Sequence, residues 1–103
     1  MQLDQTFAAL ADPTRRALLA QLEDGEKTLS DLAAPLPISL MAVQKHVHAL
    51  EASGLVRTRK VGRSRVVRLR PEGLAPVTDY VRRSEERWNA AFDRLARALE
   101  EDA

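Results

Sequence analysis

The spacing of apolar residues changes abruptly near the middle of this chain, and that change limits the folds open to it. Leu40, Val43, Val47 and Leu50 recur at helical spacing, which is the pattern of a helix with one buried face. From residue 56 to 69 the period approaches two, which indicates two strands, 56–61 and 65–69. The intervening Gly62-Arg63-Ser64 suits a tight hairpin loop, so a helix followed directly by a hairpin is expected.

Two further helices are predicted at the start of the chain. Residues 4–10 place apolar side chains on one face, which favours a first short helix. Asp12 is a favoured N-cap, and Pro13 at the first helical position loses no N–H that the helix needs. A second helix therefore begins here, and it ends at Gly25.

A short helix should precede the one that carries the central stripe. Thr28 and Asp31 form a Thr-x-x-Asp pattern that can cap a third helix, and Pro35 and Pro37 then end it. Ser39 can cap the fourth helix, which runs to about residue 53. Residues 28–53 therefore predict a helix-turn-helix.

The last part of the chain, about residues 74–99, predicts one long helix that could bend at Pro76. The order is then four helices, a two-stranded hairpin over residues 56–69 and a long helix. We therefore expect a mainly α fold with a small β-hairpin wing, a winged helix-turn-helix, in one domain over residues 1–103.

Charge is distributed very unevenly along the chain, although the net charge is only +1. Residues 54–70 contain seven Lys or Arg and no acid, whereas residues 1–53 and 71–103 each carry a net charge of −3. A basic segment in an otherwise acidic chain is typical of nucleic-acid binding. The alternative is that these charges simply form the solvated surface of a hairpin.

The helix-turn-helix and the hairpin predict how double-stranded DNA would be bound. The apolar stripe holds the fourth helix against the body, so its polar face is free to enter a major groove. The hairpin would lie beside it as a wing against the flanking phosphates or the minor groove. The expected DNA-binding residues are Ser39, Met41, Ala42, Gln44, Lys45 and His48 on the helix, with Lys60, Arg63 and Arg65 on the wing.

Gln44 could pair with adenine and Lys45 could meet guanine or a phosphate, while the Ser39 hydroxyl and the adjacent helix N–H groups could bind a phosphate. His46 lies beside the buried stripe and is expected to be a packed, hydrogen-bonded residue, whereas His48 points outward.

The final helix is longer than so small a core requires, and its apolar stripe would be exposed in a monomer. We therefore expect a homodimer with an isologous interface. Its predicted residues are Leu3, Phe7, Val81, Trp88, Phe92, Leu95 and Leu99.

Several motifs in order resemble the ArsR/SmtB family of winged-helix repressors. Residues 9–16 (Ala-Leu-Ala-Asp-Pro-Thr-Arg-Arg) resemble the family's opening signature, and the stretch from Ile38 to Val56 resembles its recognition helix and the exit into the wing. Gly62-Arg63 lies where the family usually has its wing turn. The resemblance implies a homodimer that binds an imperfect palindrome and represses a nearby promoter.

The chain departs from the metal-sensing members of that family. Those members carry a Cys-rich stretch where this chain has residues 29–33, and the chain contains no Cys. Zinc-sensing members place Asp and His pairs on the final helix, which here has no His. Position 41, often Pro in relatives, is Met. We expect no metal site and no cofactor, as in the Cys-free branch, and the inducer is unknown.

Other functions are also compatible with the pattern. One alternative is a metal or small-molecule sensor with a site at the dimer interface, and another is a winged helix that binds a protein. An enzyme is not expected, since the chain has no nucleophile elbow, no phosphate-binding Gly-rich loop and no HExxH. A signal peptide and a membrane helix are not expected either, which favours a cytoplasmic protein.

Overall fold

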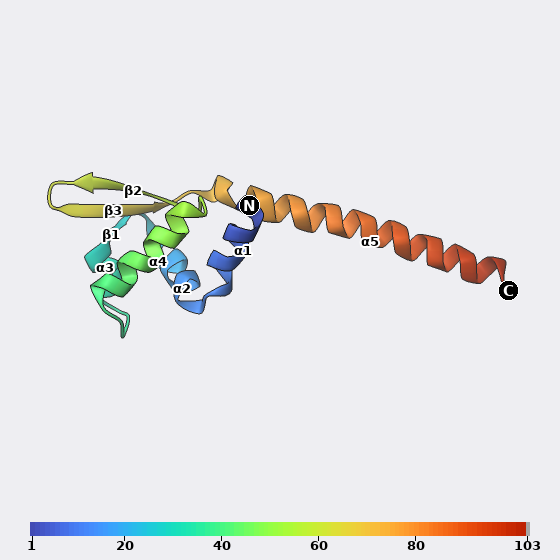
Figure 1. Cartoon of the computed structure of the whole chain (residues 1–103), viewed down its shortest axis with the longest axis horizontal. Coiled ribbons are helices and arrows are strands. Elements are labelled where there is room, and N and C mark those ends of the chain that lie inside the picture. The colour runs from blue at the N-terminus through green and yellow to red at the C-terminus, as the bar shows by residue number, and fades with distance from the viewer. Residues whose placement is uncertain (103) are drawn as a thin grey trace.

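The computed structural model describes residues 1–102 and consists of a small helical body from which a hairpin and a long helix project in opposite directions (Figure 1). The body contains α1 (Gln2–Ala11), α2 (Pro13–Gln21), α3 (Leu29–Ala33) and α4 (Leu40–Ala52). The hairpin pairs β2 (Val56–Val61) with β3 (Ser64–Leu69). Short 3₁₀ turns, η1 (Leu22–Asp24) and η2 (Pro71–Leu74), follow α2 and precede α5 (Ala75–Glu101).

Three side chains cap the helices where the sequence predicts it. The Asp12 Oδ1 accepts from the backbone N–H groups of Thr14 (2.8 Å) and Arg15 (3.1 Å) at the start of α2. Thr28 and Ser39 cap α3 and α4 in the same way, by accepting from the N–H groups three residues later. Each cap satisfies an N–H that has no partner inside its helix.

The sheet has three strands in the order β1-β3-β2, and the sequence predicted only two. The missed strand, β1 (Lys27–Thr28), pairs with Val66 and Val67 of β3. Two residues carry no alternating pattern, so no sequence signal marks such a strand. It forms because the chain between α2 and α3 runs along the free edge of β3, which is thereby covered.

The core lies between α2, α3, α4 and the base of the hairpin. Val43, Val47 and Leu50 of the predicted stripe are buried. Leu40 was wrongly included in that stripe, since 44% of its surface is exposed. It occupies the first position of α4 and lines a groove near the hairpin tip, with Arg63 and Gln44 among its neighbours there.

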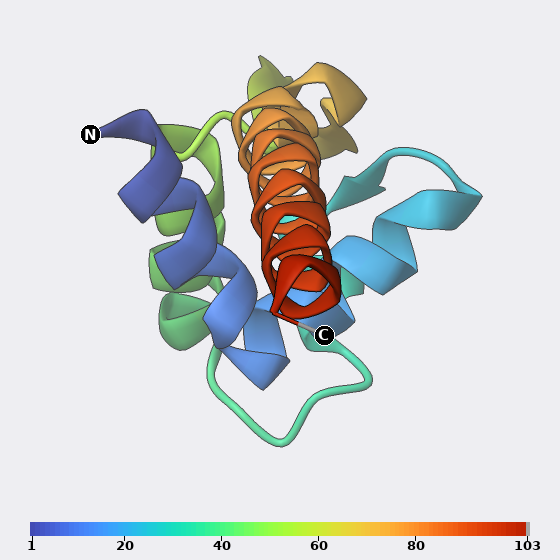
Figure 2. The ribbon, with the colours of Figure 1, turned by 90° about the vertical axis from the view of Figure 1, so that its right-hand side faces the viewer.

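Helix α5 makes the molecule 71 Å long but only 25 × 24 Å across. It contacts α1 near its own beginning, where Ser84 is buried and the rings of Phe7 and Tyr80 meet edge to face at 5.7 Å. The view down its axis shows α1 beside that base (Figure 2). Pro76 lies in the first turn of α5 rather than at a bend, because η2 already turns the chain.

Candidate nucleic-acid interface

Helix α4 presents the residues that were predicted to reach DNA. Met41, Gln44, Lys45 and His48 are all exposed, and Ala42 is half-buried. The buried stripe on the other side of the same helix holds it against the body. A polar helix face supported in this way matches what a major groove about 12 Å wide accepts.

The N-terminus of α4 is also open to solvent. The Ser39 Oγ accepts from the Ala42 N–H at 3.1 Å, so its own hydroxyl proton remains available for a phosphate oxygen. The positive end of the helix dipole adds to the attraction for an anion at this point.

The hairpin runs alongside α4 and extends beyond it (Figure 1). Its turn is formed by Gly62 and Arg63, and Gly62 has a φ of 61°, a conformation that favours glycine. Lys60 and Arg63 are exposed near the tip, on either side of the turn glycine. Neither side chain has a carboxylate partner among the described residues.

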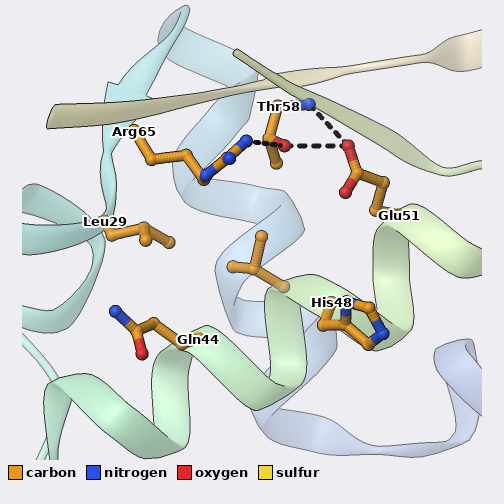
Figure 3. A pocket seen from close by; sticks show the side chains of 7 residues that line it. Leu29, Gln44, His48, Glu51, Thr58 and Arg65 are labelled. Atoms are coloured by element: carbon orange, nitrogen blue, oxygen red, sulfur yellow. Dashed lines mark hydrogen bonds between the residues drawn. The ribbon is translucent and has the colours of Figure 1, made fainter. Parts of the chain in front are cut away.

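Arg65 has a different environment from the other two predicted wing residues. Its Nη1 donates to the Thr58 Oγ1 at 2.8 Å, so the guanidinium lies between the hairpin and α4 (Figure 3). The structure therefore separates Arg65 from Lys60 and Arg63, which extend from the tip.

Hairpin and α4 are joined by a network that sequence reasoning missed. Glu51 uses one carboxylate oxygen, Oε2, to accept from both the backbone N–H (2.9 Å) and the hydroxyl (2.8 Å) of Thr58. Arg65 donates to the same hydroxyl, which links all three side chains (Figure 3). Glu51 follows Gln44 and His48 at helical spacing, and this was the only signal in the sequence that it would face the hairpin.

These residues surround a groove of about 320 Å³ between α4 and the hairpin. It is lined by Leu29, Gln44, Val47, His48, Glu51, Thr58 and Arg65. Two predicted base-reading residues, Gln44 and His48, therefore share one surface with Arg65, and Glu51 is the acid among them.

Only two of the seven basic residues in the segment 54–70 form salt bridges within residues 1–102. Arg59 binds both carboxylate oxygens of Glu26, at 2.7 and 2.8 Å, and Arg70 lies 3.3 Å from Glu72. The hydrogen bond from Arg59 holds the pKa of Glu26 below its usual value, and the same contact raises the pKa of Arg59. The other five, Arg57, Lys60, Arg63, Arg65 and Arg68, form no salt bridge with a carboxylate among the described residues.

His46 is half-buried, and its Nδ1 accepts from the Arg15 Nε at 3.3 Å, so the prediction of a packed, hydrogen-bonded histidine is confirmed. This bond joins α2 to α4. The backbone N–H of Arg15 in turn donates to Asp12, which lowers the pKa of that carboxyl.

The residues predicted for a dimer interface lie on α1 and α5. Trp88, Phe92, Leu95 and Leu99 have 64–73% of their surface exposed, while Val81 and Phe7 are less exposed and Leu3 is half-buried. Leu74 and Tyr80 are also exposed apolar residues near the base of α5, and neither was among the predicted interface residues. No local pattern in the sequence marks Tyr80, because its packing on Phe7 joins two parts of the chain that are far apart in sequence.

The described residues assemble no group of three or more His, Cys, Asp or Glu that could hold a metal ion. Across residues 1–102, no helix combines the length and the apolar character that crossing a membrane requires.

Comparisons with known proteins agree with this geometry. Residues 10–59 match a family model described as a helix-turn-helix domain. The chain is 35% identical to the HTH-type transcriptional regulator Rv2034 of Mycobacterium tuberculosis (strain ATCC 25618 / H37Rv), over 96% of this chain and 90% of that protein.

Among solved structures, an ArsR-like transcriptional regulator from Rhodococcus sp. RHA1 superposes with a TM-score of 0.89 at 34% identity, covering 97% of this chain and 92% of that one. The homodimeric winged helix-turn-helix DNA-binding domain of Mb0332 from Mycobacterium bovis gives a TM-score of 0.66 at 26% identity, over 82% and 79% of the two chains. Helix order, hairpin and relatives agree, and the chain therefore belongs to the ArsR/SmtB family of winged helix-turn-helix transcriptional regulators.

Proposed function

We propose that this protein is a homodimeric repressor that binds double-stranded DNA at an imperfect palindrome. The observation that carries the proposal is the surface formed by α4 and the hairpin. Exposed polar side chains of α4 lie beside basic residues that have no carboxylate partner among the described residues. Such a surface can read base edges and bind phosphates at the same time.

The two parts of the surface have different tasks in this proposal. Gln44, Lys45 and His48, with Met41 and Ala42, contact bases in the major groove. Lys60 and Arg63 bind the flanking phosphates, and Ser39 binds a phosphate at the start of α4. Arg65 binds a phosphate where the hairpin and α4 meet.

The dimer is supported by the uncovered apolar surface of α5. Trp88 and Phe92 are 69% and 73% exposed, and contiguous apolar patches of this kind mark association sites in soluble proteins. A two-fold dimer would present two α4 helices to half-sites about one helical turn of DNA apart, roughly 34–36 Å. Mb0332, a structural relative, is homodimeric. Such a regulator would act in the cytoplasm.

The direct test is fluorescence anisotropy with the DNA immediately upstream of the protein's own gene, over a series of salt concentrations. We expect tight binding of two protomers per site and a steep fall of affinity with salt. Weak binding with no preference over random duplex would contradict an operator at that position, and a selection of bound genomic fragments would then locate another. Failure to bind any duplex at low salt would refute the proposal and favour a protein-binding module.

Two variants separate base reading from phosphate binding. Arg63→Ala should weaken binding to all duplexes alike and reduce the salt slope by about one. Gln44→Ala should instead change which site is preferred, and an unchanged preference would remove Gln44 from the base-reading set.

A further inference from the structure

Two large apolar side chains are exposed at the start of α4, on the surface proposed to meet DNA. Leu40 and Met41 are the first two residues of the helix, and 44% and 68% of their surfaces are exposed. Among the described residues, most other large apolar side chains with such exposure lie on α1, on α5 or directly before it. Helix α4 begins on the side of the body away from α5 (Figure 1), so the exposure of this pair needs a separate explanation.

We propose that Met41 recognises the 5-methyl group of a thymine in the major groove, and that Leu40 extends the apolar surface beside it. Each half-site of the operator then contains a thymine at the position that Met41 meets. This inference rests on the proposed function, and it names the base that one residue of α4 reads.

The chemistry of the Met41 side chain points to this base. A thioether is only a weak acceptor and donates no hydrogen bond, so it cannot read the donors and acceptors that distinguish most base edges. Thymine differs from the other bases of DNA by presenting a methyl group in the major groove. Contact between that methyl group and Met41 removes apolar surface of both from water. The unbranched methionine side chain is flexible enough to follow the methyl group.

The position of Met41 relative to Gln44 predicts where the thymine lies. The two residues are three apart on α4, which is about 4.5 Å along the helix axis. Successive base pairs of DNA are about 3.4 Å apart. The thymine should therefore lie within one or two base pairs of the adenine that Gln44 is proposed to read, and each half-site should contain two neighbouring A·T pairs.

The surroundings of Leu40 place this apolar surface between side chains proposed to bind phosphates. Leu40 lines a groove of about 230 Å³ together with Gln44 and Arg63 of the hairpin turn. On its other side Leu40 directly follows Ser39, the N-cap of α4. Base edges lie between the two phosphate backbones that border a groove. A first turn that has phosphate-binding side chains on both sides is therefore suited to contact a base edge.

Replacing thymine by uracil tests the proposal, because uracil pairs in the same way and lacks only the 5-methyl group. Selection from a library of random duplexes first gives a DNA that the protein prefers, and each thymine of that DNA is then replaced in turn. At one thymine of each half-site we expect the replacement to weaken binding about three- to fivefold, which is the effect of one buried methyl group. Replacement in both half-sites should weaken binding about ten- to twentyfold.

Variants at position 41 connect the sensitive thymine to this residue. Met41→Gln keeps the length of the side chain but gives it a polar end, so this variant should bind the thymine and uracil duplexes equally well. Met41→Leu keeps an apolar end and should retain the preference for thymine. Lys45→Ala is the control on the same helix: it should weaken binding to both duplexes and leave the ratio of their dissociation constants unchanged. Met41 is exposed in the protomer, so its replacement should not alter folding.

Methylated cytosine provides a second measurement that does not depend on thymine. The methyl group of 5-methylcytosine occupies the same position of the major groove, so cytosine and 5-methylcytosine at the sensitive position differ only by that group. The wild type should bind the methylated duplex about three- to fivefold more tightly for each half-site changed, and Met41→Gln should show no difference.

The outcomes distinguish failure of this inference from failure of the proposed function. A selected duplex that binds tightly but contains no thymine sensitive to uracil would overturn the inference and leave the DNA-binding function intact. A sensitive thymine whose effect is the same in the wild type and in Met41→Gln would assign the methyl group to another residue and would also overturn it. A protein that selects no duplex from the library would refute the proposed function, and this inference with it.

Discussion

The bond between Glu51 and the hairpin allows a sharp prediction, because it places an acid on a surface proposed to bind DNA. The Glu51 Oε2 accepts two hydrogen bonds from Thr58, at 2.8 and 2.9 Å, and the Thr58 hydroxyl in turn accepts one from Arg65. Glu51 therefore has two opposed effects: its charge repels phosphates, while its acceptor fixes the hairpin beside α4. Glu51→Gln removes the charge and keeps an acceptor oxygen, whereas Glu51→Ala removes both.

The two substitutions differ by the two bonds from Thr58. Hydrogen bonds of this kind contribute about 0.5–1.5 kcal/mol each, and values in the lower half apply here because Glu51 is exposed. The difference is then about 1–2 kcal/mol, or roughly a five- to thirtyfold difference in the dissociation constant. We expect Glu51→Gln to bind every duplex somewhat more tightly than the wild type, and Glu51→Ala to bind the operator five- to thirtyfold more weakly than Glu51→Gln.

Anisotropy on operator and random duplexes, each over a salt series, measures both effects. In Glu51→Ala the hairpin is no longer held beside α4, so fewer hairpin residues reach phosphates. The salt dependence of its DNA affinity should therefore be less steep than that of Glu51→Gln. Thermal unfolding of both variants controls for general destabilisation. Equal affinities and equal salt slopes for the two variants would refute the proposed role of Glu51 in positioning the hairpin.

Three further predictions concern stability and assembly. Gly73→Ala should lower the free energy of unfolding by about 1–3 kcal/mol and the melting temperature with it, because a Cβ at this position would collide with the backbone oxygen of Gly54; an unchanged melting curve would contradict this packing. Trp88→Arg should yield a monomer by light scattering, and a mass that stays dimeric would exclude Trp88 from the interface. The pKa of Glu26 is lowered in the folded protein by Arg59, so this pair stabilises the fold above the unfolded pKa and the contribution is lost as the pH falls through the folded value. Glu26→Gln should therefore reduce the difference in stability between neutral and acidic pH, and acid unfolding curves identical to the wild type would count against it.

Local chemistry made much of the fold predictable. Asp12, Thr28 and Ser39 cap helices through bonds to N–H groups two or three residues away, so the sequence contains all the information that such contacts need. The buried faces of α4 and the hairpin turn at Gly62 are local in the same sense. The strand β1 could not be predicted, because it forms only by pairing with the edge of β3, which lies nearly forty residues further along the chain.

The candidate site likewise has features that the sequence predicts and features that it does not. Exposure of Gln44, Lys45 and His48 follows from the helical period, and their predicted places on α4 are as expected. The separation of Arg65 from the hairpin tip does not follow from any periodic pattern in the sequence. It depends on Thr58 across the hairpin and on Glu51 in another element, and these contacts exist only after the hairpin folds against α4.

The sequence by itself therefore determined the order of elements, the basic hairpin after a polar helix face, and an apolar stripe on α5 longer than the body can cover. Each of these depends on spacing along a few turns or strands, which the chain specifies locally. The tertiary structure alone decided that Leu40 is exposed and that Glu51 joins the hairpin to α4. These features depend on the distance between elements far apart in the chain, and packing sets that distance.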